Sequence, residues 1–372
     1  MNTYFPEIKK NFGFGMMRLP MVGEDVDIPQ TTAMVDAFLN AGFNYFDTAH
    51  PYISGKSELA IRRCLTSRYP RDRYLLANKL SGGCFDRQEQ LEPFFKAQLE
   101  ACGVEYFDFY LLHAVSRIRD EHYNKTGAYE FARQLKAQGK IRHLGFSYHD
   151  SAEFLDRVLT EHPEMEFVQL QFNYADYEDP KVESRKCYEV CRKHGKPVIV
   201  MEPVKGGSLI NLPREALELM EKSPASYAIR YAAGFEDVVM VLSGMSTMEQ
   251  MEDNLSYMTE FVPLSDREQA IVDQVRTWYQ ARNRIPCTDC RYCVEGCPVE
   301  VPIPRIFALL NQKHAGEGQP ETEYAQLPVK ADACIACGQC QKECPQHLNI
   351  PQLLQEAARQ IGIGSTNNTQ SL

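Results

Sequence analysis

Residues 43–52 read FNYFDTAHPY, an apolar and aromatic run that ends on the carboxylate of Asp47 and is followed by Tyr52 behind a proline. This pattern predicts a strand that ends at Asp47 and a loop that presents Tyr52. Two later runs end in the same way, YLLANK on Lys79 and FDFYLLH on His113. Since a barrel keeps its reactive groups at strand ends and in the loops that follow, we expect these four side chains to form an acid–base cluster.

The pattern of apolar runs extends in both directions from this segment. Strand-like runs lie at residues 11–20, 44–47, 74–79, 107–113, 141–147, 167–172, 197–201 and 238–243. Helix-like stretches lie at 31–39, 57–65, 88–102, 128–138, 152–160, 181–194, 225–233, 248–257 and 266–282, the first capped by Thr31 or Thr32. Eight strands alternating with helices predict an α/β fold, a (β/α)8 TIM barrel.

Length and composition limit the classes of function. The 372 residues exceed the ~250 that such a barrel needs, so we expect a second domain. A net charge of -10 disfavours a nucleic-acid partner, because phosphate binding needs a concentrated positive surface. The chain has no secretory apolar segment and no apolar run near ~18 residues, so we expect no membrane association and a cytoplasmic location.

The cysteines mark the second domain. Eight of the thirteen fall after Arg284, in two quartets with the pattern CxxCxxCxxxCP. The first quartet is Cys287, Cys290, Cys293 and Cys297, and adding 47 to each number gives the second, Cys334, Cys337, Cys340 and Cys344. We therefore expect a barrel domain at residues 1–282 and, at 283–372, a small domain of helices and loops with two metal-cluster motifs and a polar C-terminal tail.

This spacing is typical of iron–sulfur ligation. Three cysteines at two-residue gaps hold one corner of a 4Fe-4S cluster, and the fourth, before proline, binds the neighbouring cluster. We therefore expect one cluster on Cys287, Cys290, Cys293 and Cys344, and a second on Cys334, Cys337, Cys340 and Cys297. Zinc sites are the alternative, but they do not call for a third cysteine at the same gap and a fourth before proline. Over about 60 residues, this tail resembles bacterial two-cluster ferredoxins.

Five further cysteines lack such spacing. They are Cys64, Cys84, Cys102, Cys187 and Cys191. Cys187 and Cys191 share a helix face, but two thiols are too few to close a metal site. We interpret all five as small apolar residues.

The acid–base residues stand in FDTAHPY with SE following, in ANK and in LLH. In this order and context the chain resembles the aldo-keto reductases over residues 10–260. The resemblance implies hydride transfer from a nicotinamide to a small-molecule carbonyl, with Tyr52 as proton donor. A free tyrosine titrates near ~10, so Lys79 would stabilise its phenolate, Asp47 would hold Lys79, and His113 would orient the carbonyl.

Each of these residues also has an ordinary structural explanation. Asp47 and Lys79 could form a plain ion pair, His113 could be a satisfied core histidine, and Tyr52 a surface aromatic residue. The four together favour the catalytic interpretation. His50 and His149 lie in loops at the same barrel end and are candidates for lining the substrate pocket.

The same resemblance implies cofactor contacts. Ser147 in Gly145-Phe146-Ser147 and Gln169 stand where the family binds the nicotinamide amide, and Asn254 fits an adenine contact. The chain departs from the family elsewhere: Met201 replaces an aromatic residue, Gly244 begins a segment without its usual lysine, and Gln250 replaces an arginine. Lys205 is a cation that could compensate. The resemblance implies NADP(H), with NAD(H) as the alternative.

The two halves carry different redox chemistry, since a nicotinamide passes two electrons as hydride and an iron–sulfur cluster passes one. The main hypothesis is an aldo-keto reductase type of oxidoreductase with two 4Fe-4S clusters, together with a redox partner protein. One alternative is a ferredoxin-linked reductase that uses a flavin such as FMN in the barrel. Another is a nicotinamide-dependent redox sensor with vestigial turnover.

Overall fold

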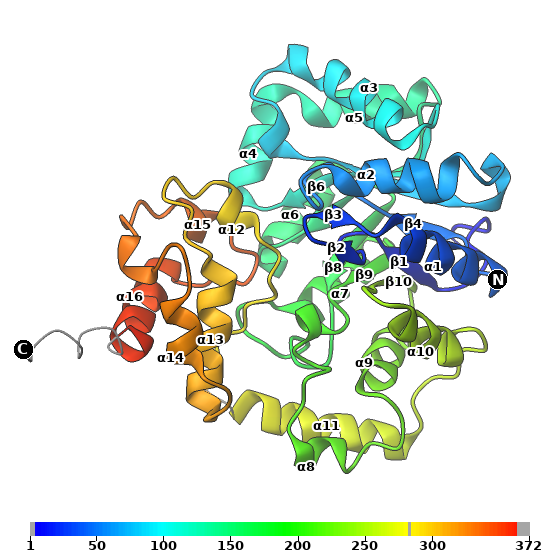
Figure 1. The fold of residues 1–372 in the computed structure, drawn as a ribbon. Helices are drawn as coiled ribbons and strands as arrows, with labels where there is room; N and C mark the ends of the chain where they lie inside the picture. The colour runs from blue at the N-terminus through cyan, green and yellow to red at the C-terminus, as the bar shows by residue number, and fades with distance from the viewer. Residues whose placement is uncertain (1–3, 282–283, 363–372) are drawn as a thin grey trace, which may run out of the picture. The chain divides into compact units, whose positions relative to one another are not determined.

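The computed structural model describes residues 4–281 and 284–362 of the chain (Figure 1). The expected domain boundary between residues 282 and 283 and the polar tail from 363 onward lie outside the described residues. Within these, the chain forms two compact units. One comprises residues 4–204 and 212–274, and the other comprises 205–211, 275–281 and 284–362.

The first unit is built on a closed barrel of parallel strands. Its strands are β1 (Phe12–Gly15), β4 (Tyr45–Asp47), β5 (Leu75–Leu80), β6 (Phe107–Val115), β7 (Ile141–Tyr148), β8 (Phe167–Gln171), β9 (Val198–Met201) and β10 (Val238–Gly244). Around the barrel they follow the order β1-β10-β9-β8-β7-β6-β5-β4. The TIM-barrel prediction is thus confirmed, because each expected strand forms close to its predicted position.

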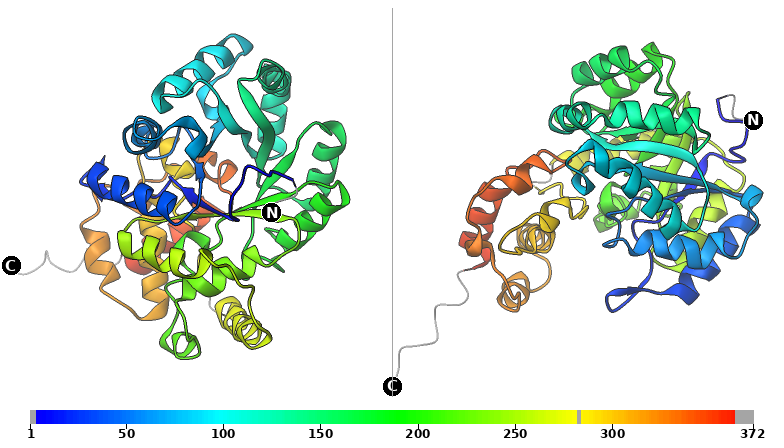
Figure 2. Two further views of the ribbon diagram at one scale, coloured as in Figure 1. Left: turned by 90° about the vertical axis from the view of Figure 1, so that its right-hand side faces the viewer. Right: turned by 90° about the horizontal axis from the view of Figure 1, so that it is seen from above.

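Helices connect successive strands and surround the barrel (Figure 2). They are α1 (Ile28–Asn40), α2 (Lys56–Ile61), α3 (Leu91–Cys102), α4 (Arg117–Thr126), α5 (Ala128–Ala137), α6 (Ala152–Glu161), α7 (Ser184–Lys193), α8 (Arg214–Leu217), α9 (Pro224–Ala233) and α10 (Met248–Met258). Helix α11 (Asp266–Ala281) runs from the first unit into the second. The apolar faces of these helices bury the outer side of the strands, as parallel sheets require.

Several local features differ from the prediction. A hairpin of β2 (Met21–Val22) and β3 (Asp25–Val26), the polar helix α4 and the short helix α8 were not expected. The predicted cap of the first helix was wrong, since Asp27 caps α1 by accepting a hydrogen bond from the backbone N–H of Gln30. Asp27 precedes a proline at the helix start, and this pair is a stronger start signal than a threonine inside the helix.

The N-terminal segment closes the bottom of the barrel. Phe5 packs its ring edge-on against Phe109 and Phe167, with ring centroids 5.1 and 6.0 Å apart. These rings belong to a buried cluster with side chains of four other strands, β4, β5, β9 and β10. In the left view of Figure 2 the dark blue N-terminal segment crosses the strands at this end. The bottom is therefore filled, and the opposite ends of the strands carry the site.

The second unit repeats one backbone pattern. Short helix α12 (Tyr292–Glu295) and longer helix α13 (Ile303–Ala315) correspond to α15 (Gln339–Lys342) and α16 (Ile350–Ile361), and α14 (Pro320–Ala325) lies between the pairs. Three left-handed residues recur at the same offset of 47: Asp289 and Ala336 (φ 52° and 54°), Arg291 and Gly338 (67° and 75°), and Glu300 and His347 (53° and 51°). The sequence repeat is therefore a repeat of conformation.

The longer helices of the second unit enclose an apolar core. It includes Ile306, Phe307 and Leu310 of α13 together with Leu354 and Ala357 of α16, all buried. Several of the cysteines pack against this core. The motif loops thus rest on a hydrophobic layer that the two helices supply.

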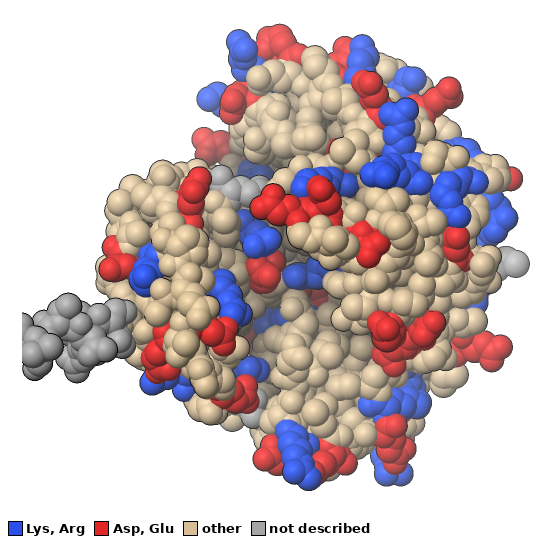
Figure 3. All heavy atoms as spheres, in the orientation of Figure 1, with Lys and Arg blue, Asp and Glu red and all other residues tan. Residues whose placement is uncertain are grey.

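In the part of the chain that the structure describes, every helix is too short or too polar to cross a membrane. On the face shown in Figure 3, acidic and basic side chains are interspersed. Elsewhere along the chain, oppositely charged surface side chains form pairs, such as Lys193 with Asp156 at 2.8 Å. Exposed pairs of this kind add little stability individually.

A more buried charge cluster lies near the N-terminal ends of the strands. His143 contacts two carboxylates, Glu7 through Nε2 at 2.5 Å and Glu166 through Nδ1 at 3.2 Å. Burial lowers the pKa of His143, but the bonds to Glu166 and Glu7 outweigh burial and raise the pKa above its ordinary value. The imidazolium form therefore ties the N-terminal segment to β7.

We expect His143→Gln to destabilise the barrel in a pH-dependent way. Since the pKa of His143 is raised by folding, its contribution is fully present below its unfolded value of ~6.5 and is lost as the pH rises through the folded value. The loss should be about 1–2 kcal/mol at pH 6 and smaller at pH 9, measured by urea denaturation. Glu7→Gln should show the same trend, and equal losses at both pH values would contradict this account.

Candidate active site and cysteine motifs

A buried ion pair stands at the carboxyl ends of β4 and β5. Ala77 on β5 lies opposite Asp47 in the parallel register, which places Lys79 beyond the end of β4. Lys79 Nζ donates hydrogen bonds to Asp47 Oδ1 at 2.6 Å and to the carbonyl oxygen of Thr48 at 2.9 Å. Both charged side chains are buried, so each depends on the other for charge compensation.

Tyr52 and His113 lie beside this pair. The ammonium of Lys79 is 4.7 Å from the centre of the Tyr52 ring. The ring centres of Tyr52 and His113 are 6.0 Å apart, and the rings are nearly perpendicular. The structure thus brings together the four side chains that the sequence singled out.

Ser81 was missed in the sequence analysis. Its Oγ lies 2.8 Å from Nδ1 of His113, and both side chains are buried. Ser81 follows Lys79 by two residues, so alternation along the strand places both on the same side. This alternation is the sequence feature that could have identified Ser81.

A bulge in β6 sets the position of His113. The pairing of β6 with β7 shifts between Leu112 and Val115, and Ala114 has a left-handed φ of 57°. The N–H of Ala114 donates to Ser147 Oγ at 2.7 Å. Bulges next to active sites re-aim a side chain. Ser147, predicted as a cofactor contact, therefore also holds the backbone that carries His113.

The electrostatics of the cluster follow from burial. Burial raises the pKa of Asp47 and lowers that of Lys79, and each charge opposes the shift of the other. Burial also lowers the pKa of His113 well below its usual value, and nearby Lys79, Arg119 and His149 lower it further. His113 is therefore neutral near pH 7.

A network of polar side chains contacts β5 from the outer side of the barrel. Glu58 is fully buried and accepts hydrogen bonds from Asn78 Nδ2 at 2.8 Å and Gln98 Nε2 at 3.3 Å. Gln98 also donates to the carbonyl oxygen of Lys79 at 2.9 Å. Nδ1 of His50 lies 2.8 Å from Glu58, and this hydrogen bond raises the pKa of His50. His50, suggested as a pocket residue, thus interacts with the supporting network.

The predicted nicotinamide contacts lie on neighbouring strands. Gln169 on β8 is opposite Ser147 on β7 in the register. Gln169 is 2% exposed, and its Oε1 lacks a hydrogen-bond partner among the residues that the structure describes. Met201 ends β9, and its carbonyl oxygen accepts from the N–H of Phe172 at 3.1 Å. Lys205 is buried and belongs to the second unit.

The predicted adenine-side contacts are engaged within the protein. Gln250 Oε1 accepts a hydrogen bond from the backbone N–H of Ser246 at 2.7 Å. Asn254 donates from Nδ2 to Ser243 Oγ at 3.0 Å and accepts from the Tyr257 hydroxyl. Both polar atoms of the Asn254 amide therefore have partners already.

Gly244 ends β10 next to a cation that the sequence analysis missed. A Cβ on Gly244 would lie 3.3 Å from Cβ of Arg18, whose carbonyl oxygen accepts from Ser246 Oγ at 2.8 Å. Arg18 thus lies along residues 244–246, where the expected lysine is lacking. Arg18 follows the end of β1 by three residues, and Asp47 ends β4. This position near a strand end is the sequence feature that could have identified Arg18 as a site residue.

The first cysteine motif lies close to the last cysteine of the second. Burial raises the pKa of the Cys293 thiol, and Cys290, Cys287, Cys344 and, least, Cys340 raise it further. Asn311 on α13 exchanges two hydrogen bonds with the backbone of Ile285, which fixes the chain just before this motif. The neighbours of Cys293 therefore include the three other residues of the predicted quartet.

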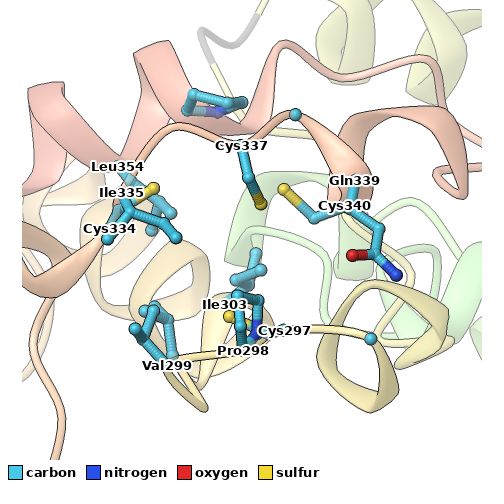
Figure 4. Close-up of a pocket in the computed structure, with 14 residues that line it drawn as sticks. Cys297, Pro298, Val299, Ile303, Cys334, Ile335, Cys337, Gln339, Cys340 and Leu354 are labelled. Carbon is cyan, nitrogen blue, oxygen red and sulfur yellow. The ribbon is translucent and has the colours of Figure 1, made fainter.

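The second motif lines a small pocket that is partly open to solvent (Figure 4). Four cysteines line it: Cys297, Cys334, Cys337 and Cys340. Burial raises the pKa of Cys340 to about 11, with Cys334 and Cys337 as the next causes. Over the described residues, no three His, Cys, Asp or Glu side chains converge on the position of a single metal ion. The four cysteines that line the pocket are those of the second predicted quartet.

The other five cysteines lie within the first unit. Cys64, Cys102, Cys187 and Cys191 are buried, and Cys84 is partly exposed. Burial raises the pKa of Cys191 well above its usual value. A buried thiol with a raised pKa is unreactive, as expected for a small apolar residue.

A closed parallel barrel with an acid–base cluster at the carboxyl ends of its strands defines a (β/α)8-barrel enzyme. Residues 11–215 match the Aldo/keto reductase family, and residues 286–355 match the 4Fe-4S dicluster domain. The first match covers more than half of the chain. The chain belongs to the aldo/keto reductase family and carries a C-terminal 4Fe-4S dicluster domain.

Individual proteins are similar over the barrel. An aldo-keto reductase of Mycolicibacterium vanbaalenii is 26% identical over 63% of this chain and 79% of that protein. The NADH-specific methylglyoxal reductase of Escherichia coli is 24% identical over 65% of this chain and 86% of its own length. The crystal structure of a Klebsiella pneumoniae aldo-keto reductase in complex with NADPH has a TM-score of 0.59, with 19% identity, 72% of this chain and 90% of that one covered.

We expect the Asp47–Lys79 pair to be strongly coupled. Asp47→Asn or Lys79→Met alone should destabilise the barrel by about 3–5 kcal/mol, because each leaves one buried charge without its partner. The double variant should lose clearly less than the sum of the two. Urea denaturation followed by far-ultraviolet circular dichroism measures this, and additive losses would contradict the coupling.

Proposed function

We propose that the barrel is an NAD(P)-dependent oxidoreductase that reduces an aldehyde, ketone or sugar-like carbonyl, with Tyr52 as the general acid. The observation that carries the proposal is the Lys79 ammonium, held by Asp47 at 2.6 Å and placed 4.7 Å from the centre of the Tyr52 ring. When bound, NAD(P)H supplies a hydride to the carbonyl carbon. Family membership and the buried acid–base cluster both support this chemistry.

Tyr52 supplies the proton that completes the reduction. As the new C–H bond forms, the electrons of the carbonyl π bond move to oxygen, which takes the phenolic proton. The phenolate left on Tyr52 is stabilised by the Lys79 ammonium. Burial lowers the pKa of Lys79, so its ammonium is also a better proton source for reprotonating Tyr52. Asp47 keeps the lysine charged and in place.

His113 orients the substrate. Its pKa is far below the usual value because of burial and the cations near it, so the ring is neutral during turnover. Ser81 Oγ lies 2.8 Å from Nδ1 of this ring. In the proposed mechanism the Ser81 hydroxyl donates to Nδ1, and the proton of the ring resides on Nε2. That N–H donates to the substrate oxygen and stabilises the negative charge that develops there.

Gln169 and Arg18 support a nicotinamide dinucleotide in this barrel. The buried Oε1 of Gln169, without a partner in the described parts of the chain, is a ready acceptor for the nicotinamide amide. Arg18, beside residues 244–246, is a cation suited to a cofactor phosphate. Among the relatives, one is named NADH-specific and one structure contains NADPH. NADP(H) and NAD(H) are both accommodated by this proposal.

The test is Tyr52→Phe, which removes the phenolic proton and keeps the ring. We expect kcat for methylglyoxal and a panel of aldehydes and ketones to fall by about 10²–10⁴-fold, with the Kd for NADPH and NADH unchanged. Turnover is followed by nucleotide absorbance. Tyr4→Phe, at the opposite end of the barrel, is the matched control and should retain full turnover. Undiminished turnover in Tyr52→Phe would refute the mechanism.

We propose further that the second unit binds two 4Fe-4S clusters with exchanged fourth ligands. Cys344 completes the first quartet and Cys297 the second, in line with the neighbours of Cys293 and the lining of the pocket at the second motif. When bound, such clusters pass single electrons. The motif loops supply the thiolates, and the N–H of Ala336 lies 3.4 Å from Cys334 Sγ, a contact that would stabilise a thiolate.

The second motif is suited to electron exchange with a redox partner protein. Cys337 is exposed, and Ile335 between the ligands is 62% exposed. An exposed apolar side chain beside a cluster ligand allows a partner to approach closely. We infer that the second cluster, rather than the first, is the point of contact.

Iron content tests the exchanged ligation. Under the proposal, Cys287→Ala/Cys344→Ala removes two ligands of one cluster and should keep about four of about eight irons per chain. Cys287→Ala/Cys297→Ala removes one ligand from each and should lose nearly all of the iron. The reverse result would assign each quartet to its own motif. Cys102→Ala, a buried thiol of the barrel, is the control and should keep the full content.

A further inference from the structure

The loop after β9 is flanked in sequence by elements of the barrel unit, but it packs within the second unit. Residues 205–211 connect β9 to α8, both of which lie in the barrel unit, yet they form part of the second unit with the cysteine motifs. The chain therefore passes between the units at 204/205, at 211/212 and at 274/275. The loop begins four residues after Met201.

Gly206 holds this loop against the first cysteine motif. A Cβ on Gly206 would lie 2.5 Å from the carbonyl oxygen and 2.6 Å from Cα of Thr288, and Gly206 has a left-handed φ of 61°. Thr288 is 2% exposed and directly follows Cys287. Since the contact joins two backbones, no side chain can move aside to relieve a substitution. The position of one segment therefore fixes the position of the other.

A second contact anchors the same loop. Ser208 Oγ lies 3.0 Å from the Tyr279 hydroxyl on α11 and donates to the carbonyl oxygen of Lys205 at 2.8 Å. The loop is thus attached within the second unit at two places. Its conformation follows that of the motif segment and of the C-terminal turns of α11.

The other end of the connection is fixed in the barrel. The carbonyl oxygen of Glu202 accepts a hydrogen bond from Asn173 Nδ2 at 3.0 Å. Only residues 203 and 204 separate this point from Lys205, and residue 203 is a proline with a restricted φ. A connection this short and stiff transmits a displacement of the loop to Met201 and Glu202.

We propose that Gly206 is a positioning residue that couples the first iron–sulfur site, through the end of β9, to nucleotide binding at Gln169 on the neighbouring strand β8. A cluster on the first quartet holds the Thr288 backbone, Thr288 holds Gly206, and the loop in turn holds the end of β9. This inference rests on the proposed function, since it takes the ligand of the barrel to be a nicotinamide nucleotide. By linkage, the effect is reciprocal, so bound nucleotide stabilises the first cluster against loss.

The test uses the anaerobically purified, cluster-loaded chain. The Kd for NADPH is measured by titration, and the loss of iron to a chelator is followed by visible absorbance with and without saturating NADPH. In the wild type, we expect two phases of iron loss, of which NADPH slows one by about fivefold or more. In Gly206→Ala the protection should disappear, and the NADPH Kd should rise.

Two glycines provide matched controls for backbone strain. Gly23 has the same φ of 61°, and Gly207 has a φ of 91°, and at neither does any described atom lie within 4 Å of the position of a Cβ. Gly23→Ala and Gly207→Ala thus introduce the strain of a left-handed alanine without the clash with Thr288. Both should keep the protection by NADPH. Protection in Gly206→Ala equal to that in Gly23→Ala would overturn the proposal.

The remaining outcomes are also decisive. NADPH that binds the wild type and leaves iron loss unchanged would refute the coupling and leave the proposed function standing. A loaded wild type that binds neither NADPH nor NADH would refute both. If Gly206→Ala fails to load clusters, Ser208→Ala and Tyr279→Phe, which weaken the second anchor of the loop, should each reduce the protection. Full protection in both would count against the coupling.

Discussion

The ammonium of Lys79, buried at the end of β5 and held by Asp47, is the constraint on which the barrel site depends. A lone ammonium in this position would shift its pKa and lose its proton, or unfold the strand end. The closed barrel avoids this by a register that sets Asp47 opposite Ala77, two residues before the lysine. The network of Glu58, Asn78 and Gln98 then fixes the backbone of Lys79 from the outer side. Stability and chemistry therefore require the same geometry.

The convergence of Asp47, Tyr52, Lys79 and His113 could be predicted from the sequence because its signals are local. Apolar runs of strand length that end in Asp, Lys and His specify both the strands and the barrel end at which those side chains meet. What the sequence did not reveal depends on register and backbone irregularity. The bulge that re-aims His113 places a left-handed alanine at position 114, which no propensity predicts, and Ser147 stabilises it from another strand. Arg18 approaches Gly244 through the closure of the barrel, a contact between distant parts of the chain.

In the second unit, the repeat was evident from the sequence, but the residues at its left-handed positions were not predictable from it. Its cysteine spacing and its 47-residue repeat were evident in the sequence, and the repeat extends to the backbone. Yet the left-handed positions carry unrelated residues, arginine in one copy and glycine in the other. A left-handed arginine costs about 1 kcal/mol or more, so a stronger requirement must impose that conformation. Wrapping three thiolates around one cluster is such a requirement, which explains why the cysteines repeat faithfully and the turn residues do not.

Two electron carriers of different capacity on one chain raise the question of how one affects the other. Direct transfer would need an agent that converts a hydride into single electrons. A mechanical link has no such requirement. It needs a segment shared by both sites, and residues 205–211 are one, since they leave the end of β9 and pack against the residue that follows Cys287. Through that segment, the occupancy of an iron–sulfur site can alter nucleotide affinity without any electron passing between them, so the dicluster domain can influence the reductase even if the two redox reactions remain separate.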